Sequence, residues 1–253
     1  MVNNKGEKID EWIIDYKLST YEEYDLSGNR GSRIEYQDGK CFIFHYPEFA
    51  VLEPEFRKRY FNTPIELTID LKERKVINFT GKFPEYFQEK EYYVFNSTRA
   101  LNKKKLIYSF ANDNDLYVYN QGIEKISVKS NFFEQSPTFD YHQYAFDYKK
   151  IEQYLVENFR YDIISFDPFR KQYYRVCLHK TNYENSNGTI NKFVDKPFSI
   201  MVLDEKFNLI KEVVFPKAEF DFTKIFVVKE GLMFSKSHPM KNDEFIKFAV
   251  YEL

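Results

Sequence analysis

The feature that most constrains this chain is a β-hairpin pattern that recurs along it. Residues 198–215 (FSIMVLDEKFNLIKEVVF) show it most clearly: an apolar strand, a polar turn at 204–206, and a strand that leaves towards the surface. The pattern recurs at 115–128 and around a turn at 73–74. Alternation of apolar and polar residues between turn residues is typical of half-buried strands. The chain is therefore expected to be all-β.

A second candidate hairpin precedes each of these, which gives repeated four-stranded antiparallel units. Units that cannot bury both faces alone are the signature of a β-propeller, in which neighbouring blades cover one another. We expect first strands to be innermost, in a single domain over 1–253. The last unit supplies only three strands, and residues 6–14 are expected to complete it by pairing with 245–251. The predicted blades span about 31–80, 98–128, 160–215 and 223–253.

One segment departs from the strand pattern, and the long spacers weigh against the alternative of a sandwich or an up-and-down barrel. Residues 148–158 carry apolar side chains at helical spacing, which predicts a short helix between blades. Spacers of about twenty residues fit long loops at a propeller mouth better than tight meanders. They lie at 46–65, 81–97, 129–147 and 180–197.

Composition narrows the function classes. Aromatic residues make up 19% of the chain, which favours sheet, and the net charge is only −2. A near-neutral chain lacks the electrostatic footprint of a nucleic-acid-binding protein. No stretch approaches the roughly 20 apolar residues of a transmembrane helix, and the N-terminus lacks the apolar core of an export signal. We expect a monomer that does not bind nucleic acid.

Three stretches carry a family resemblance: YDIISFDPFRKQYYRV (161–176), FSIMVLDEKFNLIKEVVFP (198–216) and residues 230–253. Over roughly 60–253 the chain resembles domain-of-unknown-function family 4221, bacterial propellers related to the six-bladed TolB-like propellers. The resemblance implies a periplasmic or cell-surface lipoprotein with six blades. This chain is expected to have about four blades, and its N-terminal residues do not resemble an export signal. It is therefore interpreted as a truncated six-bladed propeller, corresponding to the C-terminal two-thirds of the family, or as a genuine four-bladed relative.

No catalytic motif is found, and neither a metal nor a cofactor is predicted. None of the four histidines lies in H-E-x-x-H or at the close spacing of a metal site on one helix. Residues 112–115 (NDND) lack the Gly and Glu of an EF-hand-like loop and are predicted to form a turn. Cys41 and Cys177 lie in apolar strand-like runs and are expected to be mostly buried free thiols, although spacing leaves a disulfide between them open.

Candidate binding residues come from the two long loops 46–65 and 180–197, which join second to third strands and are therefore expected on one face. Basic residues next to an aromatic ring can stack on a ligand or engage an acidic partner. A solvated loop with aromatics tucked beneath it is the alternative. The candidates are His45, Arg57, Lys58, Arg59, Tyr60, His179 and Lys180.

Two functions remain open. The first is a non-catalytic binding or scaffold propeller that engages a protein or glycan through loops on one face. The second is a carbohydrate-active hydrolase with carboxylates at the propeller mouth. An enzyme should gather two or more carboxylates in a pocket, whereas a binding module should present aromatic and basic side chains on a flatter face. A fragment without independent function is the third possibility.

Overall fold

The structure is a computed structural model. It describes residues 7, 11, 13, 26–27, 34–44, 46–47, 54–92, 97–103, 105–120, 122–144, 146–217, 219–236 and 247–253. The chain divides into two compact units, residues 1–89 (unit 1) and residues 90–253 (unit 2). The expectation of one domain over the whole chain stays a prediction.

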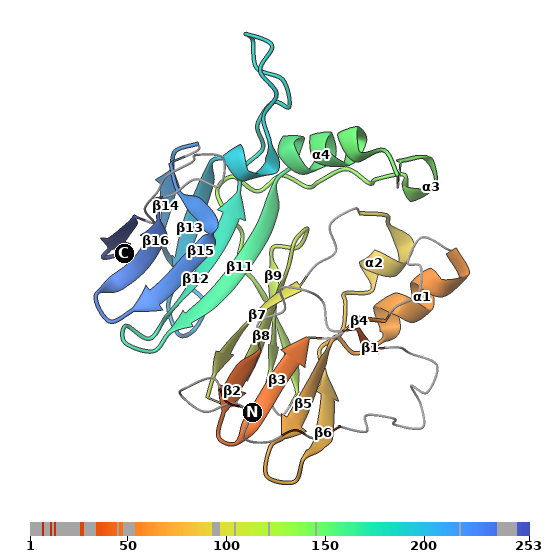
Figure 1. Ribbon diagram of the computed structural model, residues 1–253, viewed down its shortest axis with the longest axis vertical. Coiled ribbons are helices and arrows are strands. Elements are labelled where there is room, and N and C mark those ends of the chain that lie inside the picture. Colours follow the sequence, from red (N-terminus) through yellow and green to blue (C-terminus); the bar gives the residue numbers. More distant parts are fainter. Residues whose placement is uncertain are drawn as a thin grey trace. The chain divides into compact units, whose positions relative to one another are not determined.

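Unit 1 contains a four-stranded antiparallel sheet in the order β2-β3-β5-β6 (Figure 1). Asp38 and Gly39 join its first two strands in a two-residue turn, both with positive φ (51° and 76°). This turn type matches the twist of the flanking strands, and glycine adopts it without strain. The strands are β2 (Glu35–Gln37), β3 (Lys40–Phe44), β5 (Glu66–Asp70) and β6 (Lys75–Thr80); β1 (Leu26–Ser27) pairs with β4 (Tyr46–Pro47).

The prediction that residues 46–65 form a loop is wrong in part, because this segment contains helix α1 (Pro54–Asn62). Proline is favoured at the first helical position, and the Glu, Arg and Lys that follow are good helix formers. The α1 residue Phe61 is 1% exposed and packs on Phe83 and on Phe87 of α2 (Tyr86–Glu89), with ring centroids 5.0 and 5.4 Å apart. The packing of its buried aromatic residues therefore holds this segment in place, and it is not an exposed loop.

Unit 2 contains three antiparallel sheets, each built of strands consecutive in the chain. The first strand of the middle sheet, β11, contacts β7 and β15, the first strands of its two neighbours. Such packing of first strands is the arrangement of propeller blades. The sheets are β7 (Ser97–Asn102), β8 (Lys105–Phe110), β9 (Asp115–Tyr119), β10 (Ile123–Ser127); β11 (Arg160–Asp167), β12 (Gln172–Leu178), β13 (Phe198–Leu203), β14 (Leu209–Phe215); and β15 (Asp221–Val228), β16 (Gly231–Ser235), β17 (Phe248–Tyr251). The predicted all-β propeller fold is confirmed.

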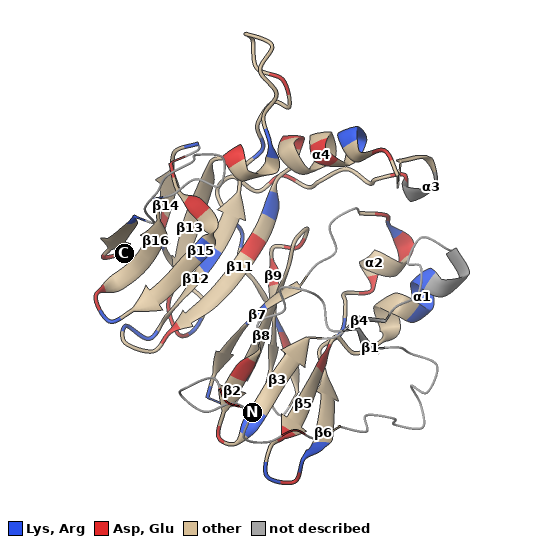
Figure 2. Ribbon diagram, viewed as in Figure 1, with Lys and Arg blue, Asp and Glu red and all other residues tan. Residues whose placement is uncertain are grey.

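The middle sheet of unit 2 buries both of its faces. All six residues of β13 are buried, and β13 and β16 carry no charged side chain (Figure 2). One face contributes Tyr161, Tyr173 and Met201 to a core shared with β7–β10. The other contributes Tyr174, Phe198 and Ile200 to a core shared with β15–β17. Burying a large apolar side chain contributes about 1.5–3 kcal/mol, so the two interfaces hold the three sheets together.

The predicted helix between blades is confirmed as α4 (Tyr148–Glu157). The Asp147 carboxylate caps it by accepting from the Lys150 backbone N–H at 3.0 Å, and Ile151, Tyr154 and Val156 form its buried side. Two short helices, α3 (Tyr141–Tyr144) and the 3₁₀ helix η1 (Phe193–Asp195), lie in the long connections.

Completion of the last blade by residues 6–14 lies outside the described residues, apart from Glu7, Glu11 and Ile13, which belong to no strand. Within the described part of the chain, β17 pairs only with β16.

Both cysteines are free, as expected, which removes the disulfide alternative. Cys177 is 0% exposed, and burial raises the pKa of its thiol to about 12. The expectation that Cys41 is mostly buried is wrong. It is half-buried, because it pairs across strands with Tyr36, an exposed residue on the same face of the sheet.

Candidate functional site

The long connections of unit 2 meet at one end of its blades. Antiparallel strands place the connections between second and third strands, and those between blades, at the same end. Figure 1 shows α3, α4 and the projecting hairpin of residues 182–191 there. We call this the loop end, and it comprises mainly residues 128–159 and 179–197. The opposite end, the turn end, carries short turns such as 168–171 and 204–208.

A polar network of buried serines centres on the half-buried Glu212 carboxylate of β14. The hydroxyls of Ser130 and Ser199 both donate to its Oε1 atom at 2.6 Å, and the Asn131 backbone N–H donates to Oε2 at 2.9 Å. Ser130 and Ser199 are 2% and 0% exposed. Hydrogen bonds to an ionised acceptor are about twice as strong as neutral ones. Glu212 therefore holds the segment after β10 against the middle sheet.

His179 extends this network at the start of the 179–197 loop. Its Nε2 atom lies 2.8 Å from the Ser199 hydroxyl. Because that hydroxyl gives its only proton to Glu212, it must accept from His179, which assigns the proton to Nε2. Burial lowers the pKa of His179, opposed by the Glu212 carboxylate and reinforced by Lys196. The imidazole is accordingly neutral near pH 7.

This His–Ser–Glu arrangement differs from a nucleophilic triad. In a triad the imidazole takes the serine proton and a carboxylate orients the imidazole. Here the Ser199 proton is directed to Glu212, His179 donates to the serine, and the hydroxyl is fully buried. The geometry supports rigidity of the loop end rather than attack on a substrate.

An exposed aromatic ring covers His179. The Phe132 ring stacks on the imidazole with centroids 4.1 Å apart and planes 23° apart, yet it remains 43% exposed. Beside it, Lys180 Nζ lies 2.6 Å from Glu134 Oε2, and both side chains are 58% exposed. Two parallel contacts therefore join residues 130–134 to residues 179–180.

Lys196 fixes the other end of the same loop. Its ammonium group donates to the carbonyls of Leu155, Val156 and Asn158 at 2.6–3.0 Å. These carbonyls lie at the C-terminus of α4, where helix carbonyls lack internal partners and a cation is favoured. Burial, with Arg160 nearby, lowers the pKa of Lys196 to about 7.

The hairpin 182–191 is anchored at its base by Asn191, which is 2% exposed. Its side-chain amide donates to the Asn182 carbonyl at 2.6 Å and to Asn185 Oδ1 at 3.0 Å, and Lys217 donates to its Oδ1 atom. The hairpin carries one charged residue, Glu184 (Figure 2). It is thus a polar projection held firmly at its base.

Arg175 of β12 fixes a shorter connection at the loop end. It is 0% exposed and donates to the backbone carbonyls of Asp113, Asn114 and Val128 and to the Ser109 hydroxyl, at 2.6–3.0 Å. The predicted turn at 112–115 is confirmed, with the Asp113 carboxylate accepting from the Asp115 N–H. One cation therefore ties the middle sheet to the turn between β8 and β9.

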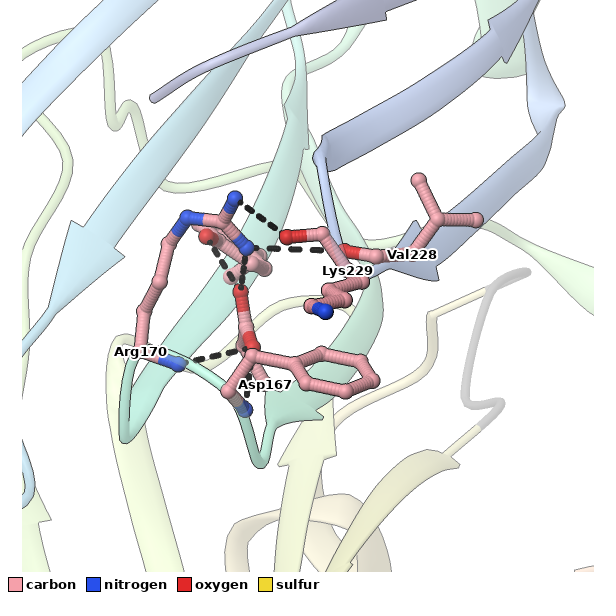
Figure 3. Close-up of polar contacts among 6 residues, drawn as sticks. Asp167, Arg170, Val228 and Lys229 are labelled. Atoms are coloured by element: carbon pink, nitrogen blue, oxygen red, sulfur yellow. Dashed lines mark hydrogen bonds and ion pairs between the residues drawn. The ribbon is translucent and has the colours of Figure 1, made fainter.

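The turn end carries a comparable link between sheets. Figure 3 shows the Arg170 side chain over the Asp167 carboxylate and reaching the carbonyls of Val228 and Lys229. Burial acts to raise the pKa of Asp167, but hydrogen bonds from Arg170 and Tyr174 hold it below its ordinary value. The Asp167 carboxylate therefore stabilises the turn and the packing of Arg170 and Tyr174 around it.

Among the described binding residues predicted in unit 1, Lys58 alone is exposed. Arg57 is 8% exposed and donates to the Phe87 carbonyl at 3.3 Å, and Tyr60 is 6% exposed. Lys58 is exposed and Arg59 half-buried on α1. The candidate His45 lies outside the described residues.

In unit 2 two predicted residues, His179 and Lys180, both contact residues 130–134, but His179 is buried and only Lys180 is exposed. Sequence reasoning missed their partners Phe132, Ser199 and Glu212. Ser199 lies in an ordinary apolar strand, and no local motif links it to Glu212, 13 residues away. Only the polar serine within FSIMVL was a signal that could have been noticed.

No group of three or more His, Cys, Asp or Glu side chains among the described residues could hold a metal ion. No described helix is long and apolar enough to cross a bilayer. A pocket of about 200 Å³ at the turn between β9 and β10 is lined by Lys105, Val118, Asn120, Gly122, Ile123 and Glu124. It contains one carboxylate, whereas glycosidases use a pair.

Comparisons with known proteins bear on fold and family. A family model described as "Domain of unknown function (DUF4221)" matches residues 2–213. That span starts nearer the N-terminus, and ends earlier, than the stretch expected from the sequence motifs. No curated protein matches. A crystal structure of a family member from Bacteroides vulgatus ATCC 8482 is similar, with a TM-score of 0.67 and 21% identity over 88% of this chain. The chain spans 64% of that structure's length.

Proposed function

The chain belongs to the DUF4221 family, whose function is unknown, and on that premise we propose that it is a non-catalytic binding module that engages a protein or glycan through the loop end of unit 2. The observation that carries the proposal is that buried or half-buried polar side chains at the loop end hold its irregular connections in place and do not line a site for chemistry. Glu212, Lys196 and Asn191 each fix a different segment. Fixing a surface before binding lowers the entropy lost on association.

The two ends of unit 2 differ in what they offer a partner. At the turn end the connections are short, and their carboxylates accept backbone N–H groups, as Asp204 does from Lys206 and Asn208. At the loop end the hairpin projects, and Phe146 and Tyr148 are 84% and 81% exposed. Exposed aromatic residues on a rigid scaffold are common in binding surfaces.

The alternative, a hydrolase at the propeller mouth, is favoured by no observation. Its carboxylates would have to be available to a substrate. Asp113, Asp167 and Glu212 instead accept hydrogen bonds from neighbouring groups. A monomeric, periplasmic or cell-surface module is the form in which we propose that the chain acts.

Position-specific photocrosslinking tests the proposal. A benzophenone side chain is placed at Asn187, in the hairpin tip, or at Glu205, in the turn between β13 and β14. Each protein is irradiated with an envelope extract of the cells in which the protein naturally occurs. Adducts should form from position 187 and be much weaker from position 205. Equal adducts from both, or none from 187 and from a third probe at Phe146, would overturn the proposal. Turnover of chromogenic glycosides that Glu212→Gln abolishes would favour the hydrolase instead.

A further inference from the structure

We propose that the loop end carries a saccharide site in which the exposed ring of Phe132 is the stacking surface, with neutral pyranosides as its ligand class. The site, here called the Phe132 platform, consists of Asn131, Phe132, Glu134 and Lys180. It rests on the proposed function, because it names the ligand chemistry of one part of the loop end.

The Phe132 ring is held in place before any ligand arrives. His179 covers one of its faces, and the Phe132 backbone N–H donates to the Ser130 hydroxyl at 3.1 Å. Both supports lead to Glu212, through Ser199 for His179 and directly for Ser130. An isolated exposed phenylalanine would lose side-chain freedom on binding, whereas this ring has already lost most of it.

Polar groups suited to hydroxyls surround the ring. Glu134 and Lys180 form an exposed ion pair that offers both acceptors and donors. Asn131 is exposed, its backbone N–H is bound by Glu212, and its side-chain amide makes no hydrogen bond within the described part of the chain. Small-ligand sites combine aromatic side chains with a few polar groups that orient the ligand.

This chemistry selects a pyranose ring of no net charge. The C–H face of a pyranose packs on an aromatic ring, while its hydroxyls both donate and accept at the rim. One acidic and one basic side chain balance each other, so neither an acidic nor a basic sugar gains a net charge partner.

Saturation-transfer NMR tests the assignment with methyl glucoside, galactoside, mannoside and N-acetylglucosaminide, and with methyl glucuronide as the charged probe. At least one neutral pyranoside should receive saturation at its C–H protons from the wild-type protein, and the glucuronide less. Phe132→Ala should weaken binding at least about fivefold, the lower limit for removing an aromatic stacking partner. Phe132→Trp, which keeps a ring on His179, should retain binding.

Phe169→Ala is the matched control, because Phe169 is a more exposed aromatic residue and lies in a short turn at the turn end. It should leave saccharide binding unchanged. Absence of transfer to every neutral pyranoside, or equal binding by wild type and Phe132→Ala, overturns the inference, as does an equal loss in Phe169→Ala. Photocrosslinking from position 187 is repeated with the Phe132→Ala protein. If adducts persist at position 187 while no saccharide binds the wild-type protein, this inference alone is refuted. If the adduct yields at positions 187 and 205 are equal, the proposed function is refuted.

Discussion

The guanidinium carbon of Arg175 lies 3.4 Å from the centroid of the Tyr161 ring, in the interior of unit 2. The two residues lie on neighbouring strands, β12 and β11, and Tyr161 OH in turn accepts from the Ser130 backbone N–H at 3.0 Å. The cation is stabilised by the ring and by backbone carbonyls of the adjacent sheet. Arg175 and Tyr161 therefore connect the middle sheet both to the neighbouring sheet and to the Ser130 segment of the loop end.

Replacement of Arg175 by methionine should destabilise the protein strongly. The change leaves the Asp113 and Val128 carbonyls and the Ser109 hydroxyl without the donor that Arg175 supplies, while the Asn114 carbonyl keeps its bond from the Val128 N–H. Each unsatisfied buried group costs about 1–3 kcal/mol. The free energy of unfolding, measured by urea denaturation, should fall by about 3 kcal/mol or more. The control Lys211→Met alters an exposed cation on β14 and should stay within about 0.5 kcal/mol of wild type. Equal effects of the two changes would contradict this role of Arg175.

Lys196 should make stability rise with pH above neutrality. Its pKa of about 7 in the folded protein lies below the ordinary 10.5, so the unfolded state binds more protons between these values. The free energy of unfolding therefore increases as pH rises from about 7 to 10.5, by less than about 1.4 kcal/mol per pH unit. Lys196→Met should remove this slope, whereas Lys149→Met, on the exposed side of α4, should retain it. An unchanged slope in Lys196→Met would show that the buried amine does not titrate in this range.

His179 should make the protein acid-sensitive. Burial holds the pKa of His179 below its ordinary value of about 6.5, so below that pH the unfolded state takes up a proton before the folded state does. The contribution of His179 to stability is complete above about pH 6.5 and is lost as pH falls towards the lowered pKa. Thermal unfolding between pH 7 and 5 should show a smaller decline for His179→Gln than for wild type. Parallel curves would assign the acid sensitivity to other groups.

Asn191 should stabilise the hairpin 182–191 without affecting the neighbouring helix α4. Asn191→Ala removes the side-chain bonds that close its base, so amide exchange of residues 183–190 should accelerate while that of α4 stays unchanged. Asn187→Ala is the matched control, because its Oδ1 atom accepts only from Thr189 at the tip. Equal acceleration in both variants would place the anchor at the tip instead of the base.

The hairpins were predictable because their sequence signals are local. Strands β13 and β14 alternate as expected, and the turn between them is fixed by Asp204, whose carboxylate accepts from Lys206 and Asn208. The Asp70 carboxylate plays the same part between β5 and β6. Period-two alternation and Asp-led turns depend on neighbouring residues, so one sequence suffices to recognise them.

Helix α1 was missed for a different physical reason. Its centre is a run of three basic residues, which is equally typical of an exposed loop. Its place is decided by the burial of Phe61 among Phe83 and Phe87, which lie more than 20 residues further along the chain. Tertiary packing of this kind leaves little trace in local sequence.

The network at the loop end could be predicted only in part. The end of a strand before a long loop singled out His179 and Lys180. Their partners depend on contacts that cross blades: Ser130 and Glu212 are separated by 82 positions, and Glu134 and Lys180 by 46. Such pairs follow from how the sheets pack, which no motif in a single sequence encodes.

The central claim is that buried polar anchors hold the loop end in one conformation before any ligand arrives. Amide hydrogen exchange of the free protein, followed by mass spectrometry, tests it most directly. Residues 130–134 and 179–192 should exchange far more slowly than an unstructured peptide of the same sequence, and Glu212→Gln should accelerate 130–134. Exchange of both segments at the unstructured rate in the wild-type protein would contradict the claim.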